Sequence, residues 1–245
     1  MNTDYNPIAE QYKRSKYQPW RTFVESFTLM ALVGDPTGLS VLDLACGEGY
    51  YTRLIRHRGA ARMTGLDLSA GMIALASAQE SSQPLGINYA VADARELSDV
   101  DPVDLVVAAY LLNYARTRDE LQTMCDGIAR SVIPGGRFVT VNTNPALDFS
   151  VAPAYRKYGF ETAVVGDWRE GTPIQWTFHL SDGPLTIENY HLDKNAHEEA
   201  FLRAGFREVR WHPAGLSPDA LVDHERAFWS TLLESSPMAF IECIR

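Results

Sequence analysis

The stretch Val41-Leu42-Asp43-Leu44-Ala45-Cys46-Gly47-Glu48-Gly49-Tyr50 joins an apolar run to an acid and a Gly-x-Gly turn. The apolar run predicts a buried strand, and the glycines predict a tight loop that leads into a helix. Because glycine has no Cβ, Gly47 and Gly49 leave room for a ligand close to the backbone. Asp43 stands where its carboxylate could accept a hydrogen bond from that ligand. The stretch therefore indicates an α/β fold that binds a nucleotide-like molecule at the end of a strand.

Two more predicted strands end in a carboxylate. The second strand ends at Asp67, and Ser69 is placed to cap the helix that follows. The third strand covers residues 87–92 and is followed by Asp93. An acid in the position of Asp67 can accept hydrogen bonds from both hydroxyls of an adenosine ribose. Three successive strands with an acid at the same edge form a narrower pattern than one glycine-rich loop.

With these motifs the chain resembles, over essentially its whole length, the class I S-adenosylmethionine (SAM) dependent methyltransferases. The resemblance implies an enzyme with SAM as its cofactor. It also implies a Rossmann-like, mostly parallel sheet with an antiparallel last strand, an N-terminal helical lid and a β-hairpin cover inserted after the fifth strand. Ala45 stands where these proteins most often have their first glycine, which is a mild change.

The resemblance further implies the residues of the site. The cofactor-binding residues expected from it are Tyr12, Lys16, Arg21, Asp43, Ala45, Gly47, Gly49, Asp67, Leu68, Met72, Asp93, Ala94 and Ala109. The substrate-binding residues expected are Trp20, Tyr110, Asn113, Trp176 and His179, with Tyr110, Asn113, His179 and His191 as groups that could orient the substrate. No catalytic base is assigned, because the methyl of SAM is already activated and orientation alone can supply ~7–11 kcal/mol.

Four shorter segments narrow the resemblance. Residues 15–16, 19–21, 46–53 and 109–114 look most like the azapteridine N-methyltransferases of toxoflavin biosynthesis. This implies transfer to ring nitrogens of a pyrimidotriazine (azapteridine), a heterocyclic small molecule. Two alternatives stay open: an O- or C-methyltransferase acting on a phenol or quinone, and a SAM-binding regulatory protein without turnover. A nicotinamide dehydrogenase is disfavoured by Thr52, because its fingerprint wants a small residue there.

Composition excludes several other classes. The 245 residues carry a formal net charge of −9, which disfavours binding to nucleic acid. Cys46, Cys125 and Cys243 lack the spacing of a metal or disulfide site, so we expect no metal. There is no apolar run long enough for a membrane span, and the polar start at residues 1–4 does not resemble a signal peptide. We expect a cytoplasmic monomer that does not bind membranes.

We expect one methyltransferase domain over residues 1–245. Its four parts are N-terminal lid helices (1–36), a SAM-binding core (37–148), a substrate cover (149–193) and the C-terminal end of the sheet (194–245). In the lid, Phe23, Phe27 and Met30 have the spacing of a single helix that packs on the domain. In the cover, Ser181-Asp182-Gly183 predicts a hairpin turn.

Helix boundaries can also be predicted in the second half of the chain. Thr117 and Glu120 form a capping box. Asn195 is expected to cap a helix that Gly205 ends, and Ser217 with Pro218 is expected to open the helix before the last strand.

Overall fold

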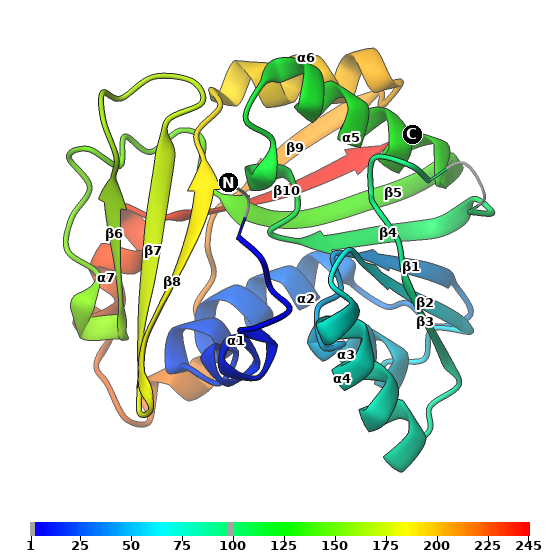
Figure 1. Cartoon of the computed structure of the whole chain (residues 1–245), viewed down its shortest axis with the longest axis horizontal. Coiled ribbons are helices and arrows are strands. Elements are labelled where there is room, and N and C mark those ends of the chain that lie inside the picture. Colours follow the sequence, from blue (N-terminus) through cyan, green and yellow to red (C-terminus); the bar gives the residue numbers. More distant parts are fainter. Residues whose placement is uncertain (1–2, 98–99) are drawn as a thin grey trace.

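The computed structural model describes residues 3–97 and 100–245, so Met1 and Asn2 of the polar start lie outside the described residues. Its largest element is a seven-stranded sheet with the order β3-β2-β1-β4-β5-β10-β9 (Figure 1). The strands are β1 (Ser40–Leu44), β2 (Arg62–Asp67), β3 (Ile87–Val91), β4 (Val103–Ala109), β5 (Val132–Thr143), β9 (Glu208–His212) and β10 (Met238–Ile244). Neighbours from β3 to β5 run parallel, whereas β10 is antiparallel to both β5 and β9. The predicted sheet with an antiparallel last strand is confirmed.

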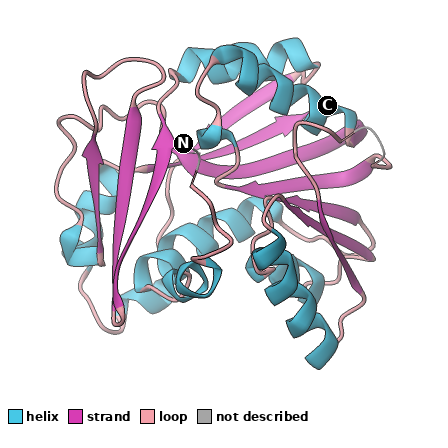
Figure 2. Ribbon diagram, viewed as in Figure 1, coloured by secondary structure: helices cyan, strands magenta, loops and turns pink. Residues whose placement is uncertain are grey.

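Helices cover both faces of this sheet (Figure 2). One face carries α2 (Phe27–Val33), α3 (Tyr50–His57) and α4 (Ala70–Ser82), and the other carries α5 (Arg118–Arg130) and α6 (Lys194–Ala204). The central strand β1 is therefore buried along its whole length, which is why its sequence is an apolar run rather than an alternation.

A second, three-stranded antiparallel sheet lies beside the first (Figure 1). It consists of β6 (Phe160–Val164), β7 (Pro173–Leu180) and β8 (Gly183–Tyr190). The hairpin predicted around residues 181–183 joins β7 to β8. The strand β6 was not predicted, and it extends the cover from a hairpin to a sheet.

The N-terminal lid differs from the single helix that was predicted. It comprises α1 (Ala9–Ser15), a π-helical turn (Arg21–Ser26) and α2. A π-helix places one more residue in each turn than an α-helix, so it rotates the buried face of the following segment. Phe27 is consequently 39% exposed, whereas Val24 and Leu29 are fully buried. The prediction that Phe27 belongs to the packed face was wrong.

Two helices near the C-terminus begin at other residues than the sequence predicted. The residue before α6 is Asp193 rather than Asn195, which lies inside the helix, while Gly205 ends the helix in a left-handed conformation as predicted. Ser217 caps only a short 3₁₀ turn (Pro218–Leu221), and the helix before β10 is α7 (Arg226–Glu234).

The predicted cap of α5 is present in altered form. The Glu120 amide donates to Thr117 Oγ1 (3.2 Å), but the Glu120 carboxylate accepts from the amide of Arg116 rather than that of Thr117 (2.7 Å). Two further short 3₁₀ turns cover Leu112–Tyr114 and Arg156–Tyr158. Within residues 3–97 and 100–245, no helix is both long and apolar enough to cross a membrane.

The altered lid face can be tested by truncating side chains. We expect Leu29→Ala to lower the free energy of unfolding by about 2–5 kcal/mol, because it leaves a cavity in the core. Phe27→Ala should cost about 1 kcal/mol or less, because its ring is partly in water already. Urea unfolding of both variants measures this. A larger loss of unfolding free energy for Phe27→Ala than for Leu29→Ala would contradict this result. It would support the predicted single helix, with Phe27 in its packed face.

Candidate functional site

The site lies where the parallel strands end. Asp67, the last residue of β2, accepts from the Gly47 amide through one carboxylate oxygen (2.9 Å) and from the Ser69 amide through the other (2.8 Å). This carboxylate therefore joins the loop after β1 to the loop after β2. Ser69 also caps α4, as predicted, by accepting from the Met72 amide (3.2 Å).

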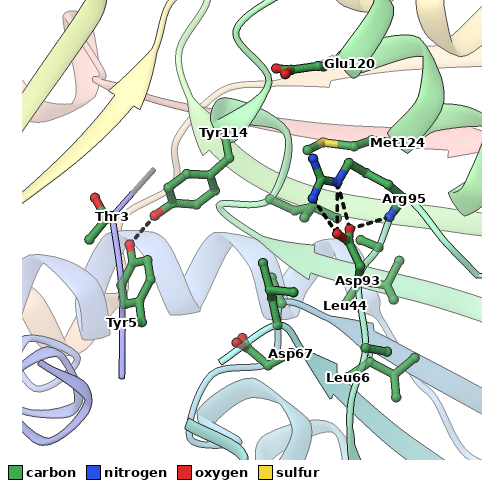
Figure 3. A pocket seen from close by; sticks show the side chains of 15 residues that line it. Thr3, Tyr5, Leu44, Leu66, Asp67, Asp93, Arg95, Tyr114, Glu120 and Met124 are labelled. Atoms are coloured by element: carbon green, nitrogen blue, oxygen red, sulfur yellow. Dashed lines mark hydrogen bonds and ion pairs between the residues drawn. The ribbon is translucent and has the colours of Figure 1, made fainter. Parts of the chain in front are cut away.

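A cavity that we call the outer pocket opens at this edge, with a volume of about 830 Å³. Asp67, Leu68, Asp93 and Ala94 line it. Figure 3 shows Tyr5 and Tyr114 on one side of the pocket and Asp93 with Arg95 on the other. Hydrogen bonds from Arg95 hold the pKa of the Asp93 carboxyl below its usual range, so this carboxylate stays ionised at the pocket wall.

A second cavity, the middle pocket, continues inward and has a volume of about 480 Å³. Several of the predicted cofactor residues line it: Tyr12, Lys16, Asp43, Ala45, Gly47, Asp67, Met72 and Ala109. It shares Tyr5, Ala45, Asp67 and Tyr114 with the outer pocket. The two cavities therefore adjoin along the ends of β1 and β2.

The backbone at Ala45 is strained. Its φ is 56°, a left-handed value that costs an alanine roughly 1–2 kcal/mol and a glycine very little. Gly47, at φ 58°, faces open space, since a Cβ there would meet only Met72 Sδ at 4.0 Å. Gly49 does not line either pocket; it precedes α3, and a Cβ there would clash with the Tyr89 hydroxyl. Gly47 thus leaves space for a ligand, whereas Gly49 leaves space for Tyr89.

Asp43 is a buried acid at the floor of the middle pocket. Burial raises its pKa to about 7, although the Thr52 hydroxyl, which donates to it at 2.6 Å, and Lys16 favour the ionised form. Thr52, which argued against a dinucleotide fingerprint, therefore has a role in holding this carboxyl. Lys16 is buried, and its ammonium lies over the rings of Tyr12 (5.1 Å) and Tyr51 (5.5 Å).

A third and smaller cavity, the inner chamber, lies between the lid and the cover sheet. Its volume is about 200 Å³, and its lining is Tyr12, Trp20, Arg21, Tyr110, Trp176, Phe178, Ile187 and Asn189. Tyr12 and Tyr110 line both this chamber and the middle pocket. The three cavities therefore form a row that runs from the strand ends to the cover.

A buried ion pair stands at the wall of the inner chamber. Arg21 Nη1 donates to both carboxylate oxygens of Glu25 (2.9 and 3.1 Å). The hydroxyls of Tyr51 (2.6 Å) and Tyr110 (2.5 Å) donate to the same carboxylate. Arg21 was predicted as a cofactor residue, yet its guanidinium is bound to Glu25 and lines the chamber rather than the two pockets.

Three predicted orienting residues lie elsewhere. His179 is on the cover sheet, with Nε2 2.9 Å from Glu161 Oε2. His191 stacks on Trp168 at 4.0 Å and is bonded to Asp193 (3.0 Å). Asn113 is buried in the turn after β4 but is not part of the lining of the three cavities. The structure therefore brings together Trp20, Tyr110 and Trp176 but not these three residues.

Sequence reasoning missed Glu25, Asn189, Tyr5 and Tyr114. Tyr114 stood inside a segment that the resemblance had already singled out, so it could have been found. Glu25 and Asn189 carry no local signal, because their importance depends on partners from other elements. Within the described residues, no group of three or more His, Cys, Asp or Glu side chains is arranged to hold a metal ion.

Comparison with known proteins supports a methyltransferase core. Residues 41–136 match the methyltransferase domain family. The chain is 35% identical over 148 residues to the ubiquinone/menaquinone biosynthesis C-methyltransferase of Desulfotalea psychrophila, which covers 58% of this chain and 56% of that protein. It is 25% identical over 219 residues to the N-demethylindolmycin N-methyltransferase of Streptomyces griseus, covering 85% and 90%.

A solved structure agrees in fold. The crystal structure of a SAM-dependent methyltransferase from Mesorhizobium loti superimposes with a TM-score of 0.64 at 21% identity, covering 90% of this chain and 97% of that one. The chain spans little more than half the length of the C-methyltransferase, so that likeness bears mainly on the core.

The raised pKa of Asp43 predicts a pH dependence. Its native pKa of about 7 lies above the ~3.9 of an unfolded aspartate, so the native state binds more protons between these values and its stability falls as pH rises through this window. Asp43→Asn removes the free-energy cost of a buried, ionised carboxylate. The variant should therefore stabilise the ligand-free protein more at pH 8 than at pH 5. Urea unfolding at both pH values measures it. An equal effect at the two pH values would contradict the shifted pKa.

Proposed function

We propose that the chain is a class I SAM-dependent methyltransferase that transfers methyl groups from SAM to ring nitrogens of an azapteridine (pyrimidotriazine), in biosynthesis of the toxoflavin type. One observation carries this proposal: a largely aromatic chamber adjoins the middle pocket and shares Tyr12 and Tyr110 with it. In this proposal residues 1–245 work as one unit, as a cytoplasmic monomer.

The chemistry of the two larger pockets fits SAM. The cofactor carries a ribose diol and an adenine, which suit the acids Asp67 and Asp93 along the outer pocket. It also carries an amino acid head, whose carboxylate suits the Lys16 ammonium and whose amine suits the carboxyl of Asp43 in the middle pocket. Gly47 offers the open backbone that a close ligand needs. When bound, SAM supplies a methyl group activated by its positively charged sulfur.

The residues of the chain must orient the substrate toward the methyl group and exclude water. Tyr110 stands between the middle pocket and the inner chamber with a left-handed φ of 63°, and its hydroxyl is anchored on Glu25. Such strain in a bulky residue persists only where surrounding contacts hold it. Trp20 and Trp176 supply flat walls for a ring, and both are at least 98% buried. A ring held there would face the cofactor pocket past the edge of Tyr110.

The size of the chamber limits the substrate. The inner chamber is the smallest of the three cavities, so we infer a substrate of no more than one or two fused rings. The N-methyltransferase from Streptomyces griseus matches over most of its length, which supports transfer to nitrogen. The second candidate is O- or C-methylation of a phenol or quinone, favoured by the 35% identity of the core to the C-methyltransferase.

A regulatory protein that binds SAM without turnover is the alternative from another class. Such a protein would not need a second, aromatic chamber beside the cofactor pocket. Turnover on any ring compound would exclude it.

The role of Lys16 can be tested by removing its charge. Lys16→Gln should weaken the binding of S-adenosylhomocysteine by roughly tenfold or more, since a buried charge-assisted hydrogen bond to the carboxylate is lost. Lys13→Gln, in the last turn of helix α1 just before Lys16, is the matched control and should bind as the wild type does. Calorimetric titration measures both. Equal affinity of Lys16→Gln and the control would remove Lys16 from the cofactor site.

The proposed reaction can be tested by mass analysis. The purified chain is incubated with SAM and the doubly demethylated pyrimidotriazine, and we expect product masses that rise in steps of one methyl. A parallel incubation with a dihydroxynaphthalene and a quinol tests the second candidate. Methylation of these compounds but not of the heterocycle would overturn the proposed substrate. Binding of S-adenosylhomocysteine with no product from any ring compound would favour the regulatory protein.

A further inference from the structure

The inner chamber contains buried N–H groups that lack an acceptor. Arg21 Nε and Trp176 Nε1 are both inaccessible to solvent and have no hydrogen-bond partner in the part of the chain that the structure describes. Both residues line the chamber. Asn189 lines it too, but its side chain is hydrogen-bonded to the Tyr114 hydroxyl. Polar atoms in a native interior are nearly always paired, so the two unpaired donors of Arg21 and Trp176 around one small cavity require an explanation.

Two of these side chains are held by hydrogen bonds to other residues. The Asn189 Oδ1 accepts from the Thr143 hydroxyl (3.1 Å). Arg21 is held by its Nη1 bonds to Glu25, while its Nε has no partner among the described residues. The Arg21 side chain is therefore held in place with one donor unpaired.

Packing holds the Trp176 indole in place. Its ring is stacked on Phe160 with centroids 5.4 Å apart and lies 6.1 Å from Phe149. It is 2% exposed and stands on β7 opposite Ile187 of β8. Rotation of the indole toward another acceptor would break these contacts, so its N–H is preorganised.

Among the described lining residues, the Tyr12 hydroxyl is the other group that can accept a hydrogen bond. The hydroxyl of Tyr110 is bonded to Glu25, and Trp20 Nε1 donates to the side-chain oxygen of Gln18 (3.1 Å). Phe178 and Ile187 are apolar. The lining therefore offers a ligand aromatic faces and unpaired hydrogen-bond donors, but few hydrogen-bond acceptors.

We propose that the inner chamber selects its substrate by acceptor atoms: Arg21 Nε and Trp176 Nε1 donate to carbonyl oxygens or unprotonated ring nitrogens of a planar one- or two-ring molecule. Molecules with amino groups in the same positions are rejected, because donors would then face donors. This inference rests on the proposed function and refines it, since a pyrimidotriazine dione presents such acceptors around its ring.

A pair of probes of equal shape tests the selection. Lumazine (pteridine-2,4-dione) carries two carbonyl acceptors, and 2,4-diaminopteridine carries amino donors in their place. Calorimetric titration of each into the complex of the wild-type chain with S-adenosylhomocysteine should show lumazine bound at least tenfold more tightly. Trp176→Phe keeps the flat ring but removes one donor, so we expect a three- to tenfold loss for lumazine and no loss for the diamine. Trp168→Phe, whose indole stacks on His191, is the matched control and should leave both unchanged.

Each outcome is decisive. Equal binding of the two probes to the wild-type chain would overturn the acceptor selection without any variant being needed, and unchanged lumazine affinity in Trp176→Phe would remove that indole from it. Affinity for S-adenosylhomocysteine, measured first in all three proteins, reports on the cofactor site separately. Failure of that binding would contradict the proposed function, whereas intact cofactor binding with no discrimination would contradict only this inference.

Discussion

The ion pair between Arg21 and Glu25 is the contact on which the arrangement of lid, core and cover depends. Both side chains are at least 98% buried. Burial raises the pKa of Glu25, but Arg21, Lys16 and two tyrosine hydroxyls outweigh it and hold the pKa below its usual value. Losing one partner of such a pair typically costs about 3–5 kcal/mol, because a buried charge is left alone. Since Tyr51 belongs to α3 and Tyr110 follows β4, satisfying Glu25 requires the lid to pack on the core.

This constraint connects the strand ends, where we propose that the cofactor binds, to the inner chamber, where we propose that the substrate binds. The ends of β1, β2 and β3 bring Asp43, Asp67 and Asp93 to one side of the sheet, where a cofactor with a ribose and an amino acid head can be held. Tyr110 closes the inner end of that edge because its hydroxyl is fixed on Glu25. Two adjoining spaces of different chemistry result: a polar one at the strand ends and an aromatic one under the cover. A methyltransferase needs such a division, since only the methyl group has to pass between its two ligands.

The sequence predicted the parts of the fold that follow from local patterns. The apolar run through Leu44, the acid at Asp67 and the cap at Ser69 have short-range causes, and the structure places all three in the sheet edge. Residues that depend on distant partners escaped prediction: the π-helical turn rotates Phe27 out of the core, and β6 forms only because β7 offers it an edge. For the same reason Glu25 and Asn189 could not be found, because their partners lie on other elements. The histidines of the cover were chosen by residue type alone, and they contact Glu161 and Asp193 instead of a cavity.

A crystal structure of the chain with S-adenosylhomocysteine and a demethylated pyrimidotriazine would test the central claim most directly. We expect the sulfur of the cofactor in the middle pocket beside Tyr110, and the heterocycle in the inner chamber with a ring nitrogen pointing at that sulfur. Carbonyl or unprotonated nitrogen atoms of the ring should then lie within hydrogen-bond distance of Arg21 Nε and Trp176 Nε1. A heterocycle bound outside the chamber, or a cofactor that leaves the strand-end acids without contact, would contradict it.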